Sequence, residues 1–200
     1  MSPKRALVLG AGAQGVCAAL ALAGRGWAVT LVDEAPDALL RASLVNEGKI
    51  HLGHVYANDP TFGTPRLMLR AALAFAPLVE RFVGHAAPWT RLRSTPFVYL
   101  VARDSQVTLG SLFTHYARLD DEYHALRQAG AGRYLDADPA TLWEEIALPP
   151  GVSPDRCQAA VATPEVAVNT REFRALLLGA VRAAPRVETL FGHRVEEATS

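Results

Sequence analysis

The sequence predicts an α/β fold, in which a Rossmann-like, doubly wound parallel sheet is interrupted by a mixed α/β region. The short apolar run 6–9 is typical of a central parallel strand buried on both faces, and 28–32 is expected to form the second strand. A glycine-rich turn and an Ala- and Leu-rich helix separate them. After a polar and proline-rich middle, a helix followed by a strand returns at 171–191. This order favours a parallel sheet that the chain leaves and then re-enters.

The composition is that of an ordinary globular protein, with 50% hydrophobic and 20% charged residues. The 20 basic and 20 acidic residues cancel, so no overall field argues for binding to nucleic acid or to an anionic membrane. The basic and apolar amino terminus resembles a secretory signal, but glycines interrupt it, and we expect folded structure and no transmembrane segment. Cys17 and Cys157 lie far apart, which favours reduced thiols in a cytoplasmic protein.

Periodicity and turn residues place the remaining elements. We expect the helices at 14–25, 64–83, 108–128 and 171–183, with one short helix near Trp143. We expect the strands at 6–9, 28–32, 97–101 and 187–191, with a further strand beginning at 194. Thr170 is the expected cap of its helix, and 41–63 reads as a polar loop with at most one short strand.

These elements divide the chain into three stretches. Residues 1–87 form the first part of a nucleotide-binding domain, 88–165 begin a substrate domain, and 166–200 return to the first domain. A sheet with only these strands leaves an exposed edge without neighbours. We therefore expect the fold to be incomplete at the C-terminus.

A glycine fingerprint joins the first strand to the first helix. It fits the pattern G-x-G-x-x-G and consists of Gly10, Ala11, Gly12, Ala13, Gln14 and Gly15. The first glycine permits a tight turn, the second lets a pyrophosphate approach the backbone, and the third lets helix and strand pack closely. The amino terminus of the helix then offers free N–H groups and a positive dipole end to the phosphates.

An acidic residue completes this fingerprint. Asp33 lies eighteen residues after Gly15, at the end of the second strand, where a carboxylate binds the ribose hydroxyls of an adenosine. The alternative interpretation is purely structural: a glycine-rich turn in an ordinary βα unit with a surface Asp. The complete structural context favours dinucleotide binding over it. A carboxylate there disfavours NADP, whereas the choice between FAD and NAD stays open at this point.

The polar loop after Asp33 carries a family resemblance. It contains an Ala42-Ser43 pair, and then Asn46-x-Gly48-x-Ile50-His51-x-Gly53-x-x-Tyr56. This run resembles the FAD-dependent oxidoreductases of the D-amino-acid oxidase superfamily, and within it most closely the L-2-hydroxyglutarate dehydrogenase branch. Segments 97–128 and 163–195 resemble the start of the family's substrate domain and the return to its FAD domain.

The resemblance implies FAD as the cofactor and extends the set of cofactor-binding residues. Beyond the glycine turn and Asp33, the set comprises Glu34, Arg41, Ala42, Ser43, Asn46, Gly48 and, through its backbone, Val195. Three residues depart from the family's pattern: Asp33 replaces the usual Glu, Glu47 stands where a small residue is common, and Asn169 replaces a frequent Asp.

One histidine of the loop is the candidate catalytic residue. His51, between Ile50 and Leu52, is either a satisfied core residue or a neighbour of the flavin that stabilises negative charge or binds a substrate carboxylate. In a regular strand, His54 and Tyr56 lie on the face opposite His51. The histidines show no metal-ligand spacing, and we expect no metal site.

The resulting hypothesis is an FAD-dependent oxidoreductase. It oxidises a C–N or C–OH bond of a small amino acid, amine or 2-hydroxy acid by hydride transfer to flavin. The electrons then pass to oxygen, a quinone or another acceptor. Two alternatives remain: an NAD-dependent dehydrogenase, which the loop 41–56 argues against, and a catalytically silent dinucleotide-binding fragment.

Overall fold

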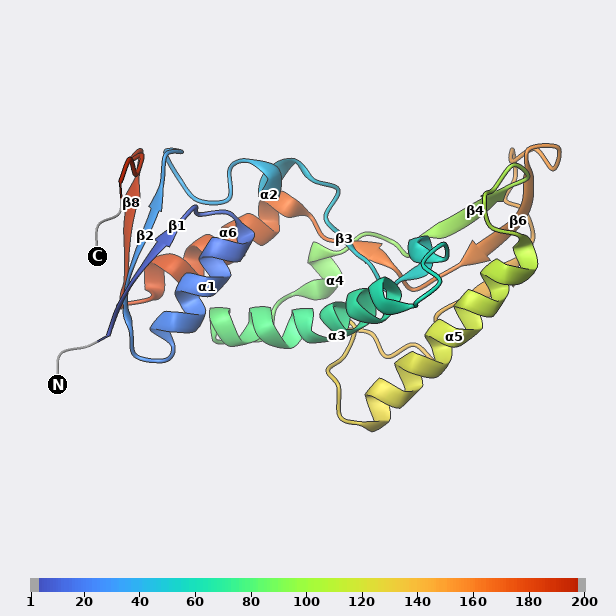
Figure 1. Cartoon of the computed structure of the whole chain (residues 1–200), viewed down its shortest axis with the longest axis horizontal. Helices are drawn as coiled ribbons and strands as arrows, with labels where there is room; N and C mark the ends of the chain where they lie inside the picture. Colours follow the sequence, from blue (N-terminus) through green and yellow to red (C-terminus); the bar gives the residue numbers. More distant parts are fainter. Residues whose placement is uncertain (1–3, 198–200) are drawn as a thin grey trace. The chain divides into compact units, whose positions relative to one another are not determined.

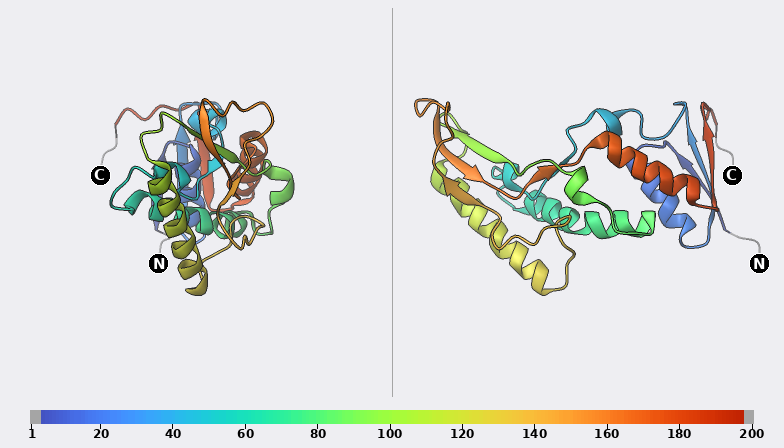
Figure 2. Two further views of the ribbon diagram at one scale, coloured as in Figure 1. Left: turned by 90° about the vertical axis from the view of Figure 1, so that its right-hand side faces the viewer. Right: turned by 180° about the vertical axis from the view of Figure 1, so that it is seen from behind.

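The computed structural model describes residues 4–197, which form two compact units (Figures 1 and 2). The first unit comprises the described residues up to Gly48, residues 79–88, and those from Asn169 onward. The second unit comprises residues 49–78 and 89–168. Residues 49–78 thus belong to the second unit, although the sequence grouped them with 1–87. The assignment of the middle stretch to substrate binding stays a prediction.

The first unit is a parallel sheet with helices on one side. Its strands are β1 (Arg5–Leu9), β2 (Ala28–Asp33) and β8 (Val187–Phe191), in the order β1-β2-β8. Helices α1 (Ala13–Ala23) and α6 (Thr170–Ala183) lie on the same side of this sheet (Figure 1). The short helix α2 (Ala42–Val45) belongs to the same unit. The predicted parallel sheet is confirmed.

An apolar core joins the helices to the sheet. In each helix two buried members lie three or four residues apart, Val16 and Ala19 in α1 and Leu177 and Val181 in α6. From β2, Leu31 joins them. The alternation in β1 shows which face is covered, because Ala6 and Val8 pack against the core while Leu7 and Leu9 are 54% and 56% exposed. The prediction that 6–9 is buried on both faces is therefore wrong for the described residues, where β1 is an edge strand covered on one face.

The second unit contains antiparallel strands. A three-stranded sheet has the order β4-β6-β5, and a separate pair joins β3 to β7. The strands are β3 (Lys49–Ile50), β4 (Val98–Ala102), β5 (Glu144–Ile146), β6 (Cys157–Ala162) and β7 (Val166–Ala167). The helical elements are η1 (His54–Tyr56), α4 (Trp89–Leu92), α5 (Leu109–Gln128) and α3 (Gly63–Val83), whose last turn belongs to the first unit.

Helix α5 follows the predicted pattern. Leu112, Tyr116, Leu119 and Tyr123 are buried at spacings of three or four residues, and the hydroxyl of Thr108 accepts a hydrogen bond from the N–H of Ser111 at 3.2 Å. This spacing defines one apolar face, and the Thr108 cap satisfies a backbone donor at the start of the helix.

Three local predictions are wrong. The helix expected near Trp143 is instead strand β5, which pairs with β6, because pairing outweighs a weak local helical signal. No strand begins at 194 in the described residues; the backbone of His193 donates to the carbonyl of Asp33 at 3.1 Å instead. Thr170 is the first residue of α6. The helix is capped by Asn169, whose side-chain oxygen accepts from the N–H groups of Arg171 and Glu172.

Other expectations concern absences within residues 4–197. Both cysteines are free thiols there. No helix in this range is long and apolar enough to cross a membrane. No group of three or more His, Cys, Asp or Glu side chains in this range is arranged so that it could hold a metal ion.

Candidate dinucleotide site

The glycine turn lies at the carboxyl end of β1, where the backbone needs two of its glycines for steric reasons. Gly10 has φ +94° and donates its N–H to the carbonyl of Val32 at 2.8 Å. A Cβ on Gly15 would stand 1.8 Å from the carbonyl oxygen of Gly10, which is far inside any allowed contact. The turn can therefore form only with glycine, or with a changed backbone, at these positions.

Gly12 is different, because nothing in the protein fills the space of its missing side chain. A Cβ there would meet only the hydroxyl oxygen of Ser43 at an ordinary 3.5 Å. Gly12 is also the N-cap residue of α1 and supplies no side-chain hydrogen bond, whereas Ser43 accepts from the N–H of Ala13 at 2.9 Å. The start of the helix is thus accessible to an anion approaching along the backbone.

Asp33 holds the turn from the end of β2. Its carboxylate accepts from the N–H of Ala11 at 2.6 Å and of Ala35 at 2.8 Å. Burial by itself would raise the pKa of Asp33, but these two donors and the charge of Arg41 outweigh it and lower this pKa. The side chain is therefore ionised at neutral pH, and each oxygen keeps lone pairs with which to accept a hydroxyl donor.

A cavity of about 310 Å³ opens beside this carboxylate. It is lined by Leu9, Gly10, Val32, Asp33, Glu34, Arg41, His193, Arg194 and Val195. Arg41 and Glu34 form an exposed ion pair across it at 2.5 Å. Sequence reasoning had named five of these residues as cofactor-binding and missed His193 and Arg194, because only the contact of His193 with the end of β2 brings them there.

The loop 41–48 keeps its own shape. The Asn46 side chain donates to the carbonyl of Ala42 at 2.8 Å and accepts from the N–H of Gly48 at 2.7 Å. Gly48 has φ +68°, and the hydroxyl of Thr170 ties the loop to α6 by donating to the carbonyl of Leu44 at 2.8 Å. Asn46 and Gly48 therefore order the loop that presents Ser43 to the glycine turn. Their contact with a cofactor stays a prediction.

These groups fit a dinucleotide. The open backbone at Gly12 suits a pyrophosphate, and an ionised carboxylate at a strand end suits ribose hydroxyls. Of the remaining turn residues, Gln14 is exposed, while Ala11 is buried and uses its carbonyl to accept from Leu39 at 2.9 Å. The donor set therefore combines backbone N–H groups with one carboxylate.

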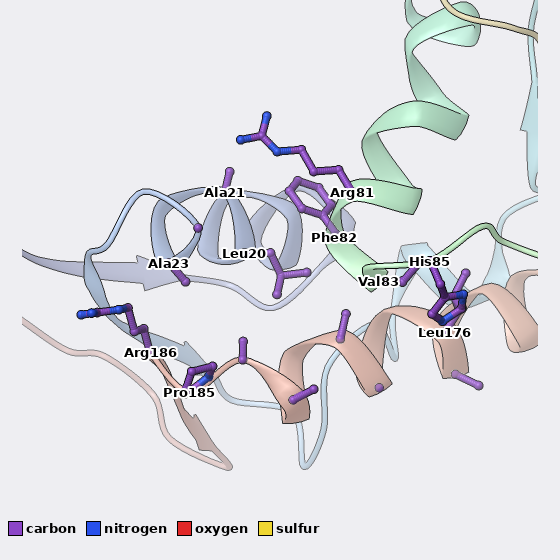
Figure 3. Close-up of a pocket in the computed structure, with 16 residues that line it drawn as sticks. Leu20, Ala21, Ala23, Arg81, Phe82, Val83, His85, Leu176, Pro185 and Arg186 are labelled. Carbon is purple, nitrogen blue, oxygen red and sulfur yellow. The ribbon is translucent and has the colours of Figure 1, made fainter.

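A larger cavity, of about 670 Å³, lies away from this chemistry. Helices α1 and α6 and residues 81–85 line it with mostly apolar side chains, and Leu20 extends into it from α1 (Figure 3). None of the predicted cofactor-binding residues lines it. Of these residues, Gly10, Asp33, Glu34, Arg41 and Val195 line the smaller cavity instead.

In the second unit, His51 belongs to a buried polar cluster. Glu165 is fully buried and accepts from the N–H of Leu52 at 2.5 Å and from the hydroxyl of Tyr99. The Nδ1 atoms of His51 and His54 both lie 3.6 Å from the same oxygen of Glu165. The prediction that His54 lies on the face opposite His51 is wrong, because β3 ends at residue 50 and the turn at Gly53 brings both rings to Glu165.

The cluster keeps its carboxylate ionised. Burial by itself would raise the pKa of Glu165, but the neighbouring donors outweigh burial and hold this pKa below its ordinary value. The donors are His54, Tyr99 and the backbone of Leu52. Burial, and then the contact with Glu165, raise the pKa of Tyr99, whose hydroxyl therefore keeps its proton. Sequence reasoning missed Glu165, for which the one signal was an acid among apolar residues at 159–168.

Comparison with known proteins decides the family. A family model described as DAO, FAD dependent oxidoreductase, matches residues 5–200. The chain belongs to this family. FAD is therefore its cofactor, and the prediction of FAD over NAD is confirmed.

Solved structures of flavoenzymes share the fold of this DAO chain. Glycine oxidase from Geobacillus kaustophilus gives a TM-score of 0.60 at 16% identity, covering 94% of this chain and 47% of its own. Iminodiacetate oxidase from Chelativorans sp. BNC1 gives a TM-score of 0.59 at 23% identity, and the match covers 94% of this chain and 46% of that enzyme. L-α-glycerophosphate oxidase from Mycoplasma pneumoniae, with FAD bound, gives a TM-score of 0.53 at 18% identity. This match covers 98% of this chain and 46% of that enzyme.

This DAO chain thus spans about half the length of the solved structures it matches. A comparison with curated protein sequences gives no match.

Proposed function

We propose that this chain supplies the FAD-binding turn and the first part of the substrate-binding region of an oxidoreductase. The enzyme oxidises a C–N or C–OH bond of a small amino acid, amine or 2-hydroxy acid. One observation carries the proposal: Gly12 caps α1 with an open backbone beside an ionised Asp33, in a chain of the DAO family.

The residues would divide the cofactor among themselves. The N–H groups of Gly12, Gln14 and Gly15 would bind the pyrophosphate beside Ala13, whose own N–H donates to Ser43. Asp33 would accept from the ribose hydroxyls. The backbone of Val195, which lines the smaller cavity, would contact the adenine. The other predicted members would line the cofactor from the same unit: Glu34, Arg41, Ala42, Ser43, Asn46 and Gly48.

Bound FAD would supply the acceptor for the hydride that leaves the carbon bearing the amine or hydroxyl. The protein must then orient the substrate and manage its charge. We propose His51 as the residue that does so, either by binding a substrate carboxylate or by stabilising negative charge that develops during oxidation. Oxygen, a quinone or another acceptor would take the electrons.

Both bond types belong in the proposal, because the oxidases with similar folds include enzymes of both kinds. Glycine oxidase and iminodiacetate oxidase act on amines, whereas glycerophosphate oxidase acts on an alcohol. At 16% to 23% identity these structures support the fold, and the substrate itself has to be found by experiment.

The first experiment is a visible absorption spectrum of the purified protein, before and after acid precipitation and after reconstitution with FAD. We expect flavin bands that move to the supernatant. Gly12→Ala tests the site, because its Cβ meets only Ser43 at 3.5 Å and leaves the fold intact, yet occupies the space of the pyrophosphate. We expect at least about a tenfold weaker affinity for FAD, which corresponds to 1.4 kcal/mol.

Gly179→Ala is the matched control, since its Cβ meets nothing within 4 Å on helix α6 of the same unit. It should bind FAD as the parent protein does. A parent protein that stays colourless after reconstitution, or a Gly12→Ala variant with unchanged affinity, would contradict the proposed site. Anaerobic bleaching of the flavin bands by amino acids, amines or 2-hydroxy acids then identifies the substrate class.

A further inference from the structure

A buried carboxylate with two facing imidazoles is the part of the second unit that the FAD site does not explain. Glu165 comes just before β7, is fully buried, and meets residues more than sixty positions away in the sequence. Ionised groups are rarely buried without a purpose or a partner. Tyr99 donates to Oε2 of Glu165 and Leu52 to its Oε1, and both imidazoles also face Oε1, which has lone-pair capacity beyond the bond from Leu52.

His51 and His54 lie at the same distance from this oxygen but differ in how far their side chains are exposed to solvent. His54 is fully buried, and its Nε2 lies 3.0 Å from the carbonyl of Leu142, which can only accept. His54 is thus enclosed by the protein, with Nε2 against Leu142 and Nδ1 buried, facing Glu165 without a regular hydrogen bond within the described residues. The ring of His51 stacks edge-on with Tyr56, and 26% of its side chain is exposed.

The exposed part of His51 is not Nδ1. That atom is buried, makes no regular hydrogen bond within the described residues, and faces Glu165 at 3.6 Å. Nε2 lies across the ring from Nδ1 and is therefore the nitrogen available to a ligand. A carboxylate behind one imidazole nitrogen fixes the proton on that nitrogen and determines the chemistry of the other.

We propose that Glu165 is the positioning residue for His51, holding a proton on Nδ1 and leaving Nε2 as the nitrogen that meets the substrate. The inference rests on the proposed function for the role of His51, but the proton position does not depend on it. In the neutral ring Nε2 is a bare acceptor. In the charged ring Nε2 donates, and the carboxylate behind Nδ1 stabilises the imidazolium.

The surroundings of Glu165 agree with this arrangement. The titratable groups that face it are the two histidines, Tyr99, Tyr116 and Tyr134. The pKa of each tyrosine is raised, first by burial, so all three stay neutral. Among these five groups, the histidines are therefore the ones that can carry a positive charge beside the carboxylate.

The decisive measurement is the tautomer of His51, by NMR of the protein labelled with isotopic nitrogen in histidine. His51→Gln removes one set of ring signals and so assigns them. We expect the neutral ring of His51 to carry its proton on Nδ1. A neutral ring protonated on Nε2 overturns the inference. This result is independent of flavin chemistry, so it can fail while FAD binding and substrate oxidation succeed, or hold while they fail.

The role in catalysis is tested with Glu165→Gln in the FAD-loaded protein. We expect at least about a tenfold slower bleaching of flavin by its substrate, with a changed pH profile, and no further loss when His51→Gln is added. A merely structural role would make the two losses multiply. His54→Gln serves as the matched control, because it faces the same oxygen yet should leave the His51 tautomer unchanged.

Discussion

The two carboxylates of this chain, Asp33 in the first unit and Glu165 in the second, accept similar hydrogen bonds by different routes. Asp33 binds N–H groups 22 and 2 residues away, across a βαβ unit of fixed spacing. Glu165 binds donors 113 and 66 residues away, from segments that only the folded chain brings together. A short-range site leaves a readable pattern of spacing, whereas a long-range one does not.

The two regions also differ in what limits substitution. At the glycine turn the limit is backbone sterics, since the space around Gly15 is occupied by the main chain itself. At Glu165 the limit is desolvation, because its removal leaves buried donors without an acceptor. The first kind of constraint is absolute and local. The second is shared among several side chains and can be relieved in part by water or by repacking.

Gly15→Ala should give the largest effect. Its Cβ would stand 1.8 Å from the Gly10 oxygen, and the backbone cannot yield without opening the turn. We expect a loss of more than about 4 kcal/mol in the free energy of unfolding, with loss of FAD binding. Urea unfolding followed by circular dichroism measures it. Gly110→Ala is the control, because nothing lies within 4 Å of its Cβ on α5, and it should be neutral or slightly stabilising. Equal midpoints for the two variants would refute the steric argument.

Replacing each carboxylate by alanine compares the two regions directly. Glu165→Ala removes the acceptor of the buried N–H of Leu52 and of the part-buried hydroxyl of Tyr99, which should cost about 3–5 kcal/mol. Asp33→Ala also frees two backbone donors, but both of their bonds to Asp33 are only part-buried, so about 1–2 kcal/mol is expected. Both values come from chemical unfolding at neutral pH. The comparison breaks if Asp33→Ala is the more damaging of the two.

Acid should destabilise the protein partly through Glu165. Its pKa is lowered in the folded state, so its ionised form stabilises the fold above the unfolded pKa of about 4.3, and this contribution is lost as the pH falls through the lower folded value. We expect the unfolding free energy of the parent protein to fall below about pH 4.3, and that of Glu165→Gln to fall less steeply. Parallel pH curves for the two proteins would mean that the pKa of Glu165 is the same in the folded and unfolded states.

The comparison also explains how much the sequence could predict. The βαβ unit, the parallel sheet and the shape of the glycine turn follow from local spacing, and the family resemblance in the loop 41–56 identified FAD. The position of His54 was mispredicted because the chain leaves the β conformation after Ile50 and turns at Gly53, whose φ is +119°. No role for Glu165 could be predicted from the sequence, because its importance depends on partners that local periodicity does not reveal.

The N-terminal cap of helix α6 allows a test of helix capping with a small expected effect. The cap is Asn169, whereas the sequence predicted Thr170. Asn169 accepts from the N–H groups of Arg171 and Glu172 at 3.1 and 3.2 Å, so Asn169→Ala should cost about 1 kcal/mol. Thr170→Ala removes instead a hydroxyl that donates to the carbonyl of Leu44 in the loop that presents Ser43. It should leave helix stability nearly unchanged but weaken FAD binding, because a looser loop no longer holds Ser43 against the turn. Unfolding midpoints and FAD titrations of the two variants separate these effects, and a Thr170→Ala variant that destabilises the helix more than Asn169→Ala would restore Thr170 as the cap.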